Sequence, residues 1–356
     1  MRRFPHRSLP IALAAVTALG AGALVFSAIA NASGRNANAA TPKATVTKAR
    51  ALTLTNQPNF GYPHLKVSGH PLKSVTFVNP LPSYPEWAVT NQCFARAARD
   101  LGATARLVGP TTINIPQMVT DLQQAIALHT QAIITAPIEP GAFTAVLSSA
   151  RKHGILVATV NADSPQTTRN FNMETSTRQM GALVADTLIK RTRGHAEIGI
   201  ISTGPTEVNQ SQEIAAFKAK LRGHPGMKVV SSQYDNSESS QAASETSAML
   251  AANPALSVVW TVEGEAPPGV ITALRQAHKV GKVLVIGVDL TPQTRADLRS
   301  GAIWGTTVQN FCAWGGAALY DLAGIKEGGH VPSFINTGSA LVTKSNLNDY
   351  RFSFSS

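Results

Sequence analysis

The strongest constraint on the fold of this chain is a regular alternation that begins near Lys73, in which short β-branched runs are separated by longer helical patterns. The runs show no polar alternation, which is typical of strands buried on both faces of a parallel sheet, and the intervening segments suit the helices of βαβ units. Strands are predicted at residues 74–78, 104–108, 132–135, 156–160, 197–201, 228–231, 257–260 and 283–287, and residues 306–310 are predicted to end a further short strand.

Eight βα units exceed one compact open sheet, so the residues alone leave two α/β architectures open. These are two Rossmann-like lobes and a single (β/α)8 barrel. In doubly wound sheets the ligand site lies beyond the carboxyl ends of the strands, so the residues that follow each strand are the first candidates for a site.

Composition excludes several classes of protein. Of 356 residues, 44% are hydrophobic and only 14% are charged, which argues against a highly charged disordered chain and a long coiled coil. Two cysteines cannot build a disulfide-dense scaffold or a four-cysteine zinc site. The formal net charge of +11 is spread without a block of like charges, so no nucleic-acid partner is predicted.

The N-terminus predicts export. A segment at residues 1–7 with three arginines precedes an apolar run at 9–30, and Ala30-Asn31-Ala32 provides a small-x-small cleavage pattern. Residues 1–32 are therefore predicted to be a signal peptide, and an uncleaved membrane anchor is the alternative. No cysteine lies near the end of the run, where a lipid would be attached, which argues against a lipid anchor. Residues 33–72 are predicted to be a flexible tail, and the mature chain to be periplasmic or extracellular.

Polar and aromatic side chains follow the predicted strands. Amides and carboxylates exchange paired hydrogen bonds with vicinal hydroxyls, and aromatic faces cover the apolar face of a sugar ring. Each such residue alone also suits a turn or a helix cap, so only their recurrence points to a site. The strand ends carry Asn79, Tyr84, Trp87, Asn161, Asp163, Asn209, Gln210, Glu263, Glu265, Asp289 and Gln309.

An ordered series of motifs resembles a known family. Asn79-Pro80 follows the first strand, residues 131–137 read Gln-Ala-Ile-Ile-Thr-Ala-Pro, residues 150–157 read Ala-Arg-Lys-His-Gly-Ile-Leu-Val, and Gly287-Val288-Asp289 ends the eighth strand. Over about residues 73–350 the chain thereby resembles periplasmic sugar-binding proteins of the ribose-binding type, which are solute receptors of ABC transporters. The resemblance implies the type I periplasmic binding protein fold, with two Rossmann-like lobes of parallel sheet joined by a three-segment hinge.

The resemblance also implies boundaries and ligand contacts. Lobe 1 would comprise residues 73–168 and 310–333, lobe 2 residues 169–309 and 334–350, and a C-terminal tail residues 351–356. By position, the implied ligand contacts are Asn79, Tyr84, Trp87, Asp163, Glu263, Asp289 and Gln309.

One departure from the family's pattern changes the expected ligand. The family often carries an arginine four residues before the phenylalanine of the helix after the fifth strand, but Glu213 stands there, and Asn209 and Gln210 would supply polar contacts instead. The predicted cleft is therefore acidic, with Asp163, Glu213, Glu263 and Asp289, and Glu265 as a further candidate. Acidic groups suit an amino sugar or another cation, and a pentose, hexose, deoxysugar or polyol stays open as well.

The resemblance places both cysteines in lobe 1, with Cys93 in the first helix and Cys312 opening the helix after the last crossover. A Cys93–Cys312 disulfide is therefore predicted, with two buried free thiols as the alternative.

No nucleophile elbow, P-loop, dinucleotide-binding glycine pattern or zinc motif occurs, and the histidines lack metal-ligand spacing. The expected protein is thus a monomer without metal, cofactor or enzymatic activity, which hands a small polar ligand to an ABC permease after hinge closure. A glycoside hydrolase using two cleft carboxylates and a ligand sensor for a membrane receptor are the alternatives.

Overall fold

A computed structural model describes residues 63–350, except for the side chain of Asp349. The predicted signal peptide, most of the predicted tail and residues 351–356 lie outside this range. Within it, no helix combines the length and apolar character that crossing a membrane requires.

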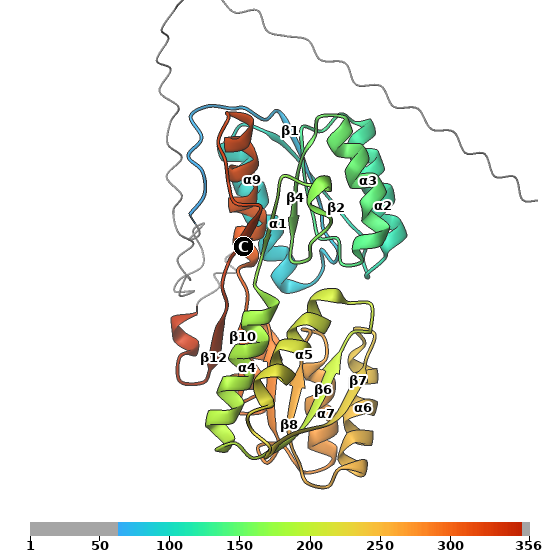
Figure 1. The fold of residues 1–356 in the computed structure, drawn as a ribbon, viewed down its shortest axis with the longest axis vertical. Coiled ribbons are helices and arrows are strands. Elements are labelled where there is room, and N and C mark those ends of the chain that lie inside the picture. Colours follow the sequence, from blue (N-terminus) through green and yellow to red (C-terminus); the bar gives the residue numbers. More distant parts are fainter. Residues whose placement is uncertain (1–62, 351–356) are drawn as a thin grey trace, which may run out of the picture. The chain divides into compact units, whose positions relative to one another are not determined.

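The first sheet contains six parallel strands in the order β11-β5-β4-β3-β1-β2. Helices α1 (Pro85–Asp100) and α9 (Phe311–Lys326) cover one face, and α2 (Ile115–Ala127) and α3 (Pro140–Lys152) cover the other (Figure 1). The strands are β1 (Ser74–Val78), β2 (Thr104–Val108), β3 (Ala132–Thr135), β4 (Leu156–Val160), β5 (Phe171–Glu174) and β11 (Phe334–Asn336), and a short 3-10 helix, η1 (Gln166–Thr168), precedes β5.

The second sheet repeats this arrangement in the order β12-β10-β9-β8-β6-β7, with only β12 antiparallel to its neighbour. Helices α4 (Thr177–Thr192) and α5 (Val208–Leu221) cover one face, and α6 (Ser239–Ala252) and α7 (Pro267–Gln276) cover the other. The remaining elements are β6 (Ala196–Ser202), β7 (Met227–Tyr234), β8 (Leu256–Thr261), β9 (Leu284–Val288), α8 (Pro292–Ser300), β10 (Gly305–Val308), β12 (Ala340–Thr343) and η2 (Leu347–Asp349).

Two separate six-stranded sheets exclude the barrel and confirm the two-lobe α/β fold. The predicted boundaries at residues 168 and 333 are too early, because β5 pairs with β4, and β11 pairs with β5, in the first sheet. These strands are only four and three residues long, which is too short for a periodic signal in the sequence.

The chain passes between the sheets three times, after β5, after β10 and after β11. The first and third crossovers are bonded together, since Thr337 N donates to Glu174 O at 2.8 Å and Thr175 Oγ1 donates to Gly338 O at 3.1 Å. Trp314 Nε1 of α9 donates to Thr337 Oγ1 at 3.3 Å, which fixes the third crossover to the first lobe.

Two further features stabilise α9. Cys312 and Cys93 of α1 form the predicted disulfide. Residues 63–72, which were predicted to belong to a flexible tail, pack along the helix instead: Leu65 N donates to Asp321 Oδ1 at 2.8 Å, and Leu72 is fully buried in the core. Gly324 permits this approach, because a Cβ there would lie 2.5 Å from that of Leu65.

Candidate functional site

A pocket lies where the carboxyl ends of strands from both sheets meet, as expected for doubly wound folds. Its cavity volume is about 110 Å³, which is room for several water molecules. The first sheet contributes the β1–α1 loop and the end of β4, and the second contributes the loops after β6, β7, β8 and β9, while Gln309 and Phe311 come from the crossover after β10.

Eight of the ten side chains predicted to contact a ligand line this pocket. They are Tyr84, Trp87, Asn209, Gln210, Glu213, Glu263, Asp289 and Gln309. The structure thus brings together residues that are up to 225 positions apart in the sequence, from Tyr84 to Gln309.

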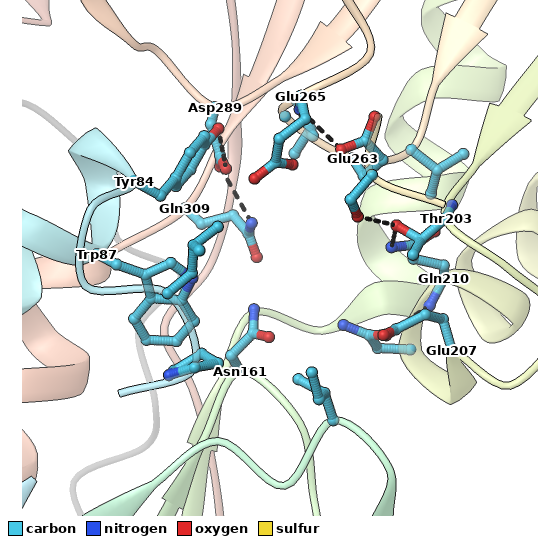
Figure 2. Close-up of a pocket in the computed structure, with 18 of the residues that line it drawn as sticks. Tyr84, Trp87, Asn161, Thr203, Glu207, Gln210, Glu263, Glu265, Asp289 and Gln309 are labelled. Atoms are coloured by element: carbon cyan, nitrogen blue, oxygen red, sulfur yellow. Dashed lines mark hydrogen bonds between the residues drawn. The ribbon is translucent and has the colours of Figure 1, made fainter. Parts of the chain in front are cut away.

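Asp289 connects the two lobes at one end of the pocket (Figure 2). Tyr84 Oη donates to its Oδ2 at 3.1 Å, and Gln309 Nε2 donates to its Oδ1 at 3.1 Å. Burial raises the pKa of Asp289 to about 7, although both hydrogen bonds oppose that increase. Asp289 can therefore accept further hydrogen bonds only through lone pairs that these two donors leave free.

Trp87 and Tyr84 form an aromatic wall on the first-lobe side. The Trp87 ring packs edge-on against Phe311, with centroids 5.3 Å apart, and lies 5.6 Å from the ring of Trp314. Only 7% of Trp87 is exposed, so the neighbouring rings hold it in one orientation. A rigid aromatic surface of this kind suits the apolar face of a small ring-shaped ligand.

The opposite side is formed by the β6–α5 loop, whose polar groups are partly bonded to one another (Figure 2). Thr203 N donates to Gln210 Oε1 at 2.9 Å and Gln210 Nε2 donates to Thr203 Oγ1 at 3.0 Å. Asn209 Oδ1 accepts from the backbone N–H of Gln210 at 2.9 Å, which leaves the Asn209 side-chain amide nitrogen without a bond in the structure. The side chain of Gln210 therefore holds the loop in its conformation, because both of its polar groups are already bonded to Thr203.

Two buried glutamates lie on the second-lobe side. Glu263 Oε2 accepts from Glu265 N at 2.7 Å, and burial followed by the nearby Glu265 and Asp235 raises the pKa of Glu263 well above its usual range. Glu213 is 3% exposed, and its Oε1 has no hydrogen-bond partner. Burial, and then the Asp289 carboxylate, raise the pKa of Glu213 well above its usual range.

Further along the same side, Glu207 precedes α5 and also lines the pocket. Burial, and then the carboxylate of Glu139, raise its pKa to about 7. With Glu265 included, five carboxyl side chains line the pocket, whereas none of its lining residues is a lysine, arginine or histidine. Across residues 63–350, no three histidine, cysteine or acidic side chains are grouped closely enough to hold a metal ion.

Asn79 lies outside the pocket lining, contrary to the expectation from the sequence. It is fully buried, its Nδ2 donates to Asn91 Oδ1 at 2.8 Å and to Trp87 O at 3.3 Å, and its Oδ1 accepts from Leu81 N at 2.9 Å. These bonds fix the turn after β1 and the start of α1, so Asn79 positions the aromatic wall without itself lining the pocket.

Asp163 also lies outside the pocket lining. Its carboxylate is paired with Arg169, whose Nε contacts Oδ1 and whose Nη2 donates to Oδ2 at 2.6 Å, and Arg169 Nη1 donates to Ser333 O at 2.7 Å. The pair ties the loop after β4 to the segment before β11. Asp163 is therefore a structural ion pair rather than a pocket residue.

The pocket residue at the end of β4 is Asn161, which is two positions before Asp163 and is drawn in Figure 2. Its backbone has φ 63°, a left-handed conformation that asparagine tolerates better than most residues. Thr203, Glu207 and Ser237 also line the pocket, from the loops after β6 and β7, and were not among the predicted ligand contacts, although Thr203 lies just after a predicted strand.

Comparison with known proteins places this geometry in context. The crystal structure of GanP, a glucose-galactose binding protein from Geobacillus stearothermophilus, is 26% identical with a TM-score of 0.74, and the match covers 78% of this chain and 99% of that one. An ABC transporter solute binding protein from Burkholderia graminis, in complex with D-arabinose, is 29% identical with a TM-score of 0.75 over 80% of this chain and 99% of that one.

No curated protein matches the sequence. The family described as periplasmic binding protein domain, however, matches residues 75–329, which include every residue that lines the pocket and both sheets except for β11, β12 and the first residue of β1. The chain therefore belongs to the periplasmic binding protein family.

Proposed function

We propose that this chain is an exported solute-binding protein that captures a sugar or sugar-like small polar ligand between its two lobes and delivers it unchanged to the permease of an ABC transporter. The observation that carries the proposal is the pocket itself, in which an aromatic wall of Tyr84 and Trp87 faces amides and carboxylates of the second lobe. The sugar ligands named for related structures from Geobacillus and Burkholderia support the ligand class.

In this scheme the contacts that form when the lobes close around the ligand would supply the binding energy. In an open form the pocket amides and carboxylates are solvated, and closure around a ligand removes competing water and strengthens each hydrogen bond. The ligand shifts the population toward the closed form only as far as it binds that form better. Because Tyr84 belongs to the first lobe and Asp289 to the second, their hydrogen bond is one of the contacts that closure would form.

A thermal-shift screen of the purified protein against pentoses, hexoses, deoxysugars, polyols and amino sugars tests the proposal. A ligand at about 100 times its dissociation constant stabilises the folded state by about 2.7 kcal/mol, a shift of several degrees. The bound compound should be recovered chemically unchanged, and size-exclusion chromatography should give a monomer. The proposal fails if no member of the panel shifts the unfolding temperature, or if the protein converts its ligand to product.

A further inference from the structure

We infer that the ligand of this pocket carries a protonated amine in addition to hydroxyl groups, as an amino sugar or an amine-bearing polyol does. The inference rests on the proposed function and narrows it to a chemical class. It starts from the charges of the side chains that line the pocket, where five carboxyl groups converge and no basic side chain is present.

Glu213 provides the observation that points to a bound group. It lines the pocket, is 97% buried, and leaves Oε1 without a hydrogen-bond partner. A buried polar atom without a partner is costly, and natural proteins rarely retain one unless something else satisfies it. An ammonium group offers three hydrogen-bond donors and the compensating charge together, whereas a hydroxyl offers one donor and no charge.

The arrangement of the acids indicates an organic cation rather than a metal ion. Glu207 and Glu213 come from the α5 segment, Glu263 and Glu265 from the β8–α7 loop, and Asp289 from the end of β9. Within the described part of the chain, these groups do not form a cluster of three or more that could hold a metal ion. Carboxylates distributed around a cavity instead suit a ligand whose amine and hydroxyl groups point in different directions.

The aromatic wall is consistent with the same ligand. Trp87 and Tyr84 line the pocket, and the face of an aromatic ring attracts a cation placed near it. The charged groups that act on Asp289 and Glu213 are also acidic: burial is the main cause of the raised pKa of each, and Glu265 adds to it for Asp289 as Asp289 does for Glu213. A neutral ligand would leave these acids to repel one another or to remain protonated, and an ammonium group removes both costs.

Matched sets of compounds provide the test. D-glucosamine, D-galactosamine and D-mannosamine are each compared by calorimetry at pH 7 with the parent hexose and with the N-acetyl derivative, which keeps the nitrogen but loses the charge. We expect at least one amine to bind tenfold or more tightly than both of its neutral counterparts. If the neutral hexoses bind as tightly as the amines, the inference is overturned while the proposed function stands. If no compound of these sets binds but another sugar or polyol of the thermal-shift panel does, the inference alone is overturned, and if that panel gives no ligand either, both are overturned.

Variants of the acids give a second readout. Glu213→Gln and Glu263→Gln replace a carboxyl group, which can ionise beside a bound ammonium group, by a neutral amide of the same shape, so each should reduce the preference for the amine over its parent hexose by about tenfold. Glu245→Gln on α6 is the matched control, because Glu245 does not line the pocket. This variant should keep the preference for the amine that the unmodified protein shows. Thermal unfolding verifies that each variant is folded, and an unchanged preference in both folded pocket variants overturns the assignment.

Discussion

Asn161 and Asp289 occupy equivalent positions in the two sheets. Each directly follows the strand that holds the third place in its sheet, β4 or β9, and each has a left-handed backbone, with φ of 63° and 66°. Their backbone N–H groups donate to the neighbouring strand in the same way, to Met173 O at 3.3 Å and to Thr307 O at 2.6 Å. The repeated fold thus presents one amide and one carboxylate to the pocket from corresponding strand ends.

This equivalence predicts different roles for Asn161 and Asp163. Asn161→Gly removes the pocket amide, and glycine adopts the left-handed backbone freely, so the sugar that gives the largest thermal shift should bind about tenfold more weakly while the unfolding temperature changes little. Calorimetry and thermal unfolding measure the two effects.

Asp163→Ala should do the opposite. It leaves Arg169, which is 8% exposed, without its carboxylate, so we expect a loss of roughly 1–3 kcal/mol in the free energy of unfolding and an unchanged dissociation constant. If Asp163→Ala weakens binding as strongly as Asn161→Gly does, the assignment of the two residues is wrong.

Asp289→Asn tests the contact between the lobes. Asparagine tolerates the left-handed backbone and keeps the shape of the side chain, but it offers one acceptor oxygen where Tyr84 and Gln309 now donate to two. We expect the ligand to bind at least tenfold more weakly in calorimetry, without unfolding of the protein. Unchanged affinity would remove Asp289 from the binding site.

Gly264→Ala tests how closely the lobes approach. A Cβ on Gly264 would lie 1.7 Å from Tyr84 Oη, so the added methyl group must displace the tyrosine that bonds Asp289. We expect affinity to fall by more than tenfold. Gly204→Ala is a suitable control, because a Cβ there meets nothing within 4 Å. Equal affinities for the two variants would contradict the close approach of Gly264 to Tyr84.

The stability of the unliganded protein should fall as the pH rises from about 4 to 7. Burial raises the pKa of Asp321 to about 7, as it does for Glu207 and Asp289, whereas unfolded carboxyl groups titrate near 4. Over this range the folded state keeps protons that the unfolded state loses, so each group removes on the order of 1–3 kcal/mol of stability. Urea unfolding at pH 5 and pH 8 measures the difference.

Asp321→Asn separates this effect from the pocket, because Asp321 lies on α9 and bonds Leu65. The variant should show a weaker dependence of stability on pH and should bind ligand as the unmodified protein does. Stability that rises between pH 5 and pH 8 in the unmodified protein would show that these carboxyl groups are ionised in the folded state.

Removal of the disulfide should lower stability without changing specificity. The bond closes a loop between residues 219 positions apart, and losing such a constraint costs about 2–5 kcal/mol. Cys93 and Cys312 are both on helices that pack against the first sheet, so the Cys93→Ala/Cys312→Ala variant should keep its ligand preference. Urea unfolding with and without reductant checks the first expectation, and calorimetry checks the second.

The sequence predicted most strands of the fold because the apolar runs of the inner strands are buried on both faces, as in β1, β3, β4, β6, β8 and β9. All eight predicted strands, and the further short strand predicted before Asn310, which is β10, occur within a few residues of their expected bounds, whereas β5, β11 and β12, which have three or four residues each, were missed. Their positions depend on pairing with neighbours that are distant in the sequence, such as β11 with β5. Local periodicity carries no information on such pairing.

The direction of side chains after a strand was harder to predict. Asn79 and Asp163 follow β1 and β4 and carry polar groups that suit a ligand contact. Their side chains are instead bonded to Asn91 and Arg169, outside the pocket lining. Both partners lie outside the strand-end segments, so only tertiary contacts decide the outcome. A comparison of the two halves of the sequence would have helped, because Val160-Asn161 and Val288-Asp289 stand at the same point of the repeat.

The hydrogen-bonded crossovers also restrict how the two lobes can move relative to each other. Thr175 and Thr337 lie side by side, and a third connection runs from Val308 to Phe311, so the two halves share three short links instead of one. A single link would permit twisting and sliding, whereas several adjacent links leave little freedom beyond rotation about one axis. Every cycle of capture and release would then return the aromatic wall to the same acids in the same register, so the selectivity of the protein would not vary from one cycle to the next.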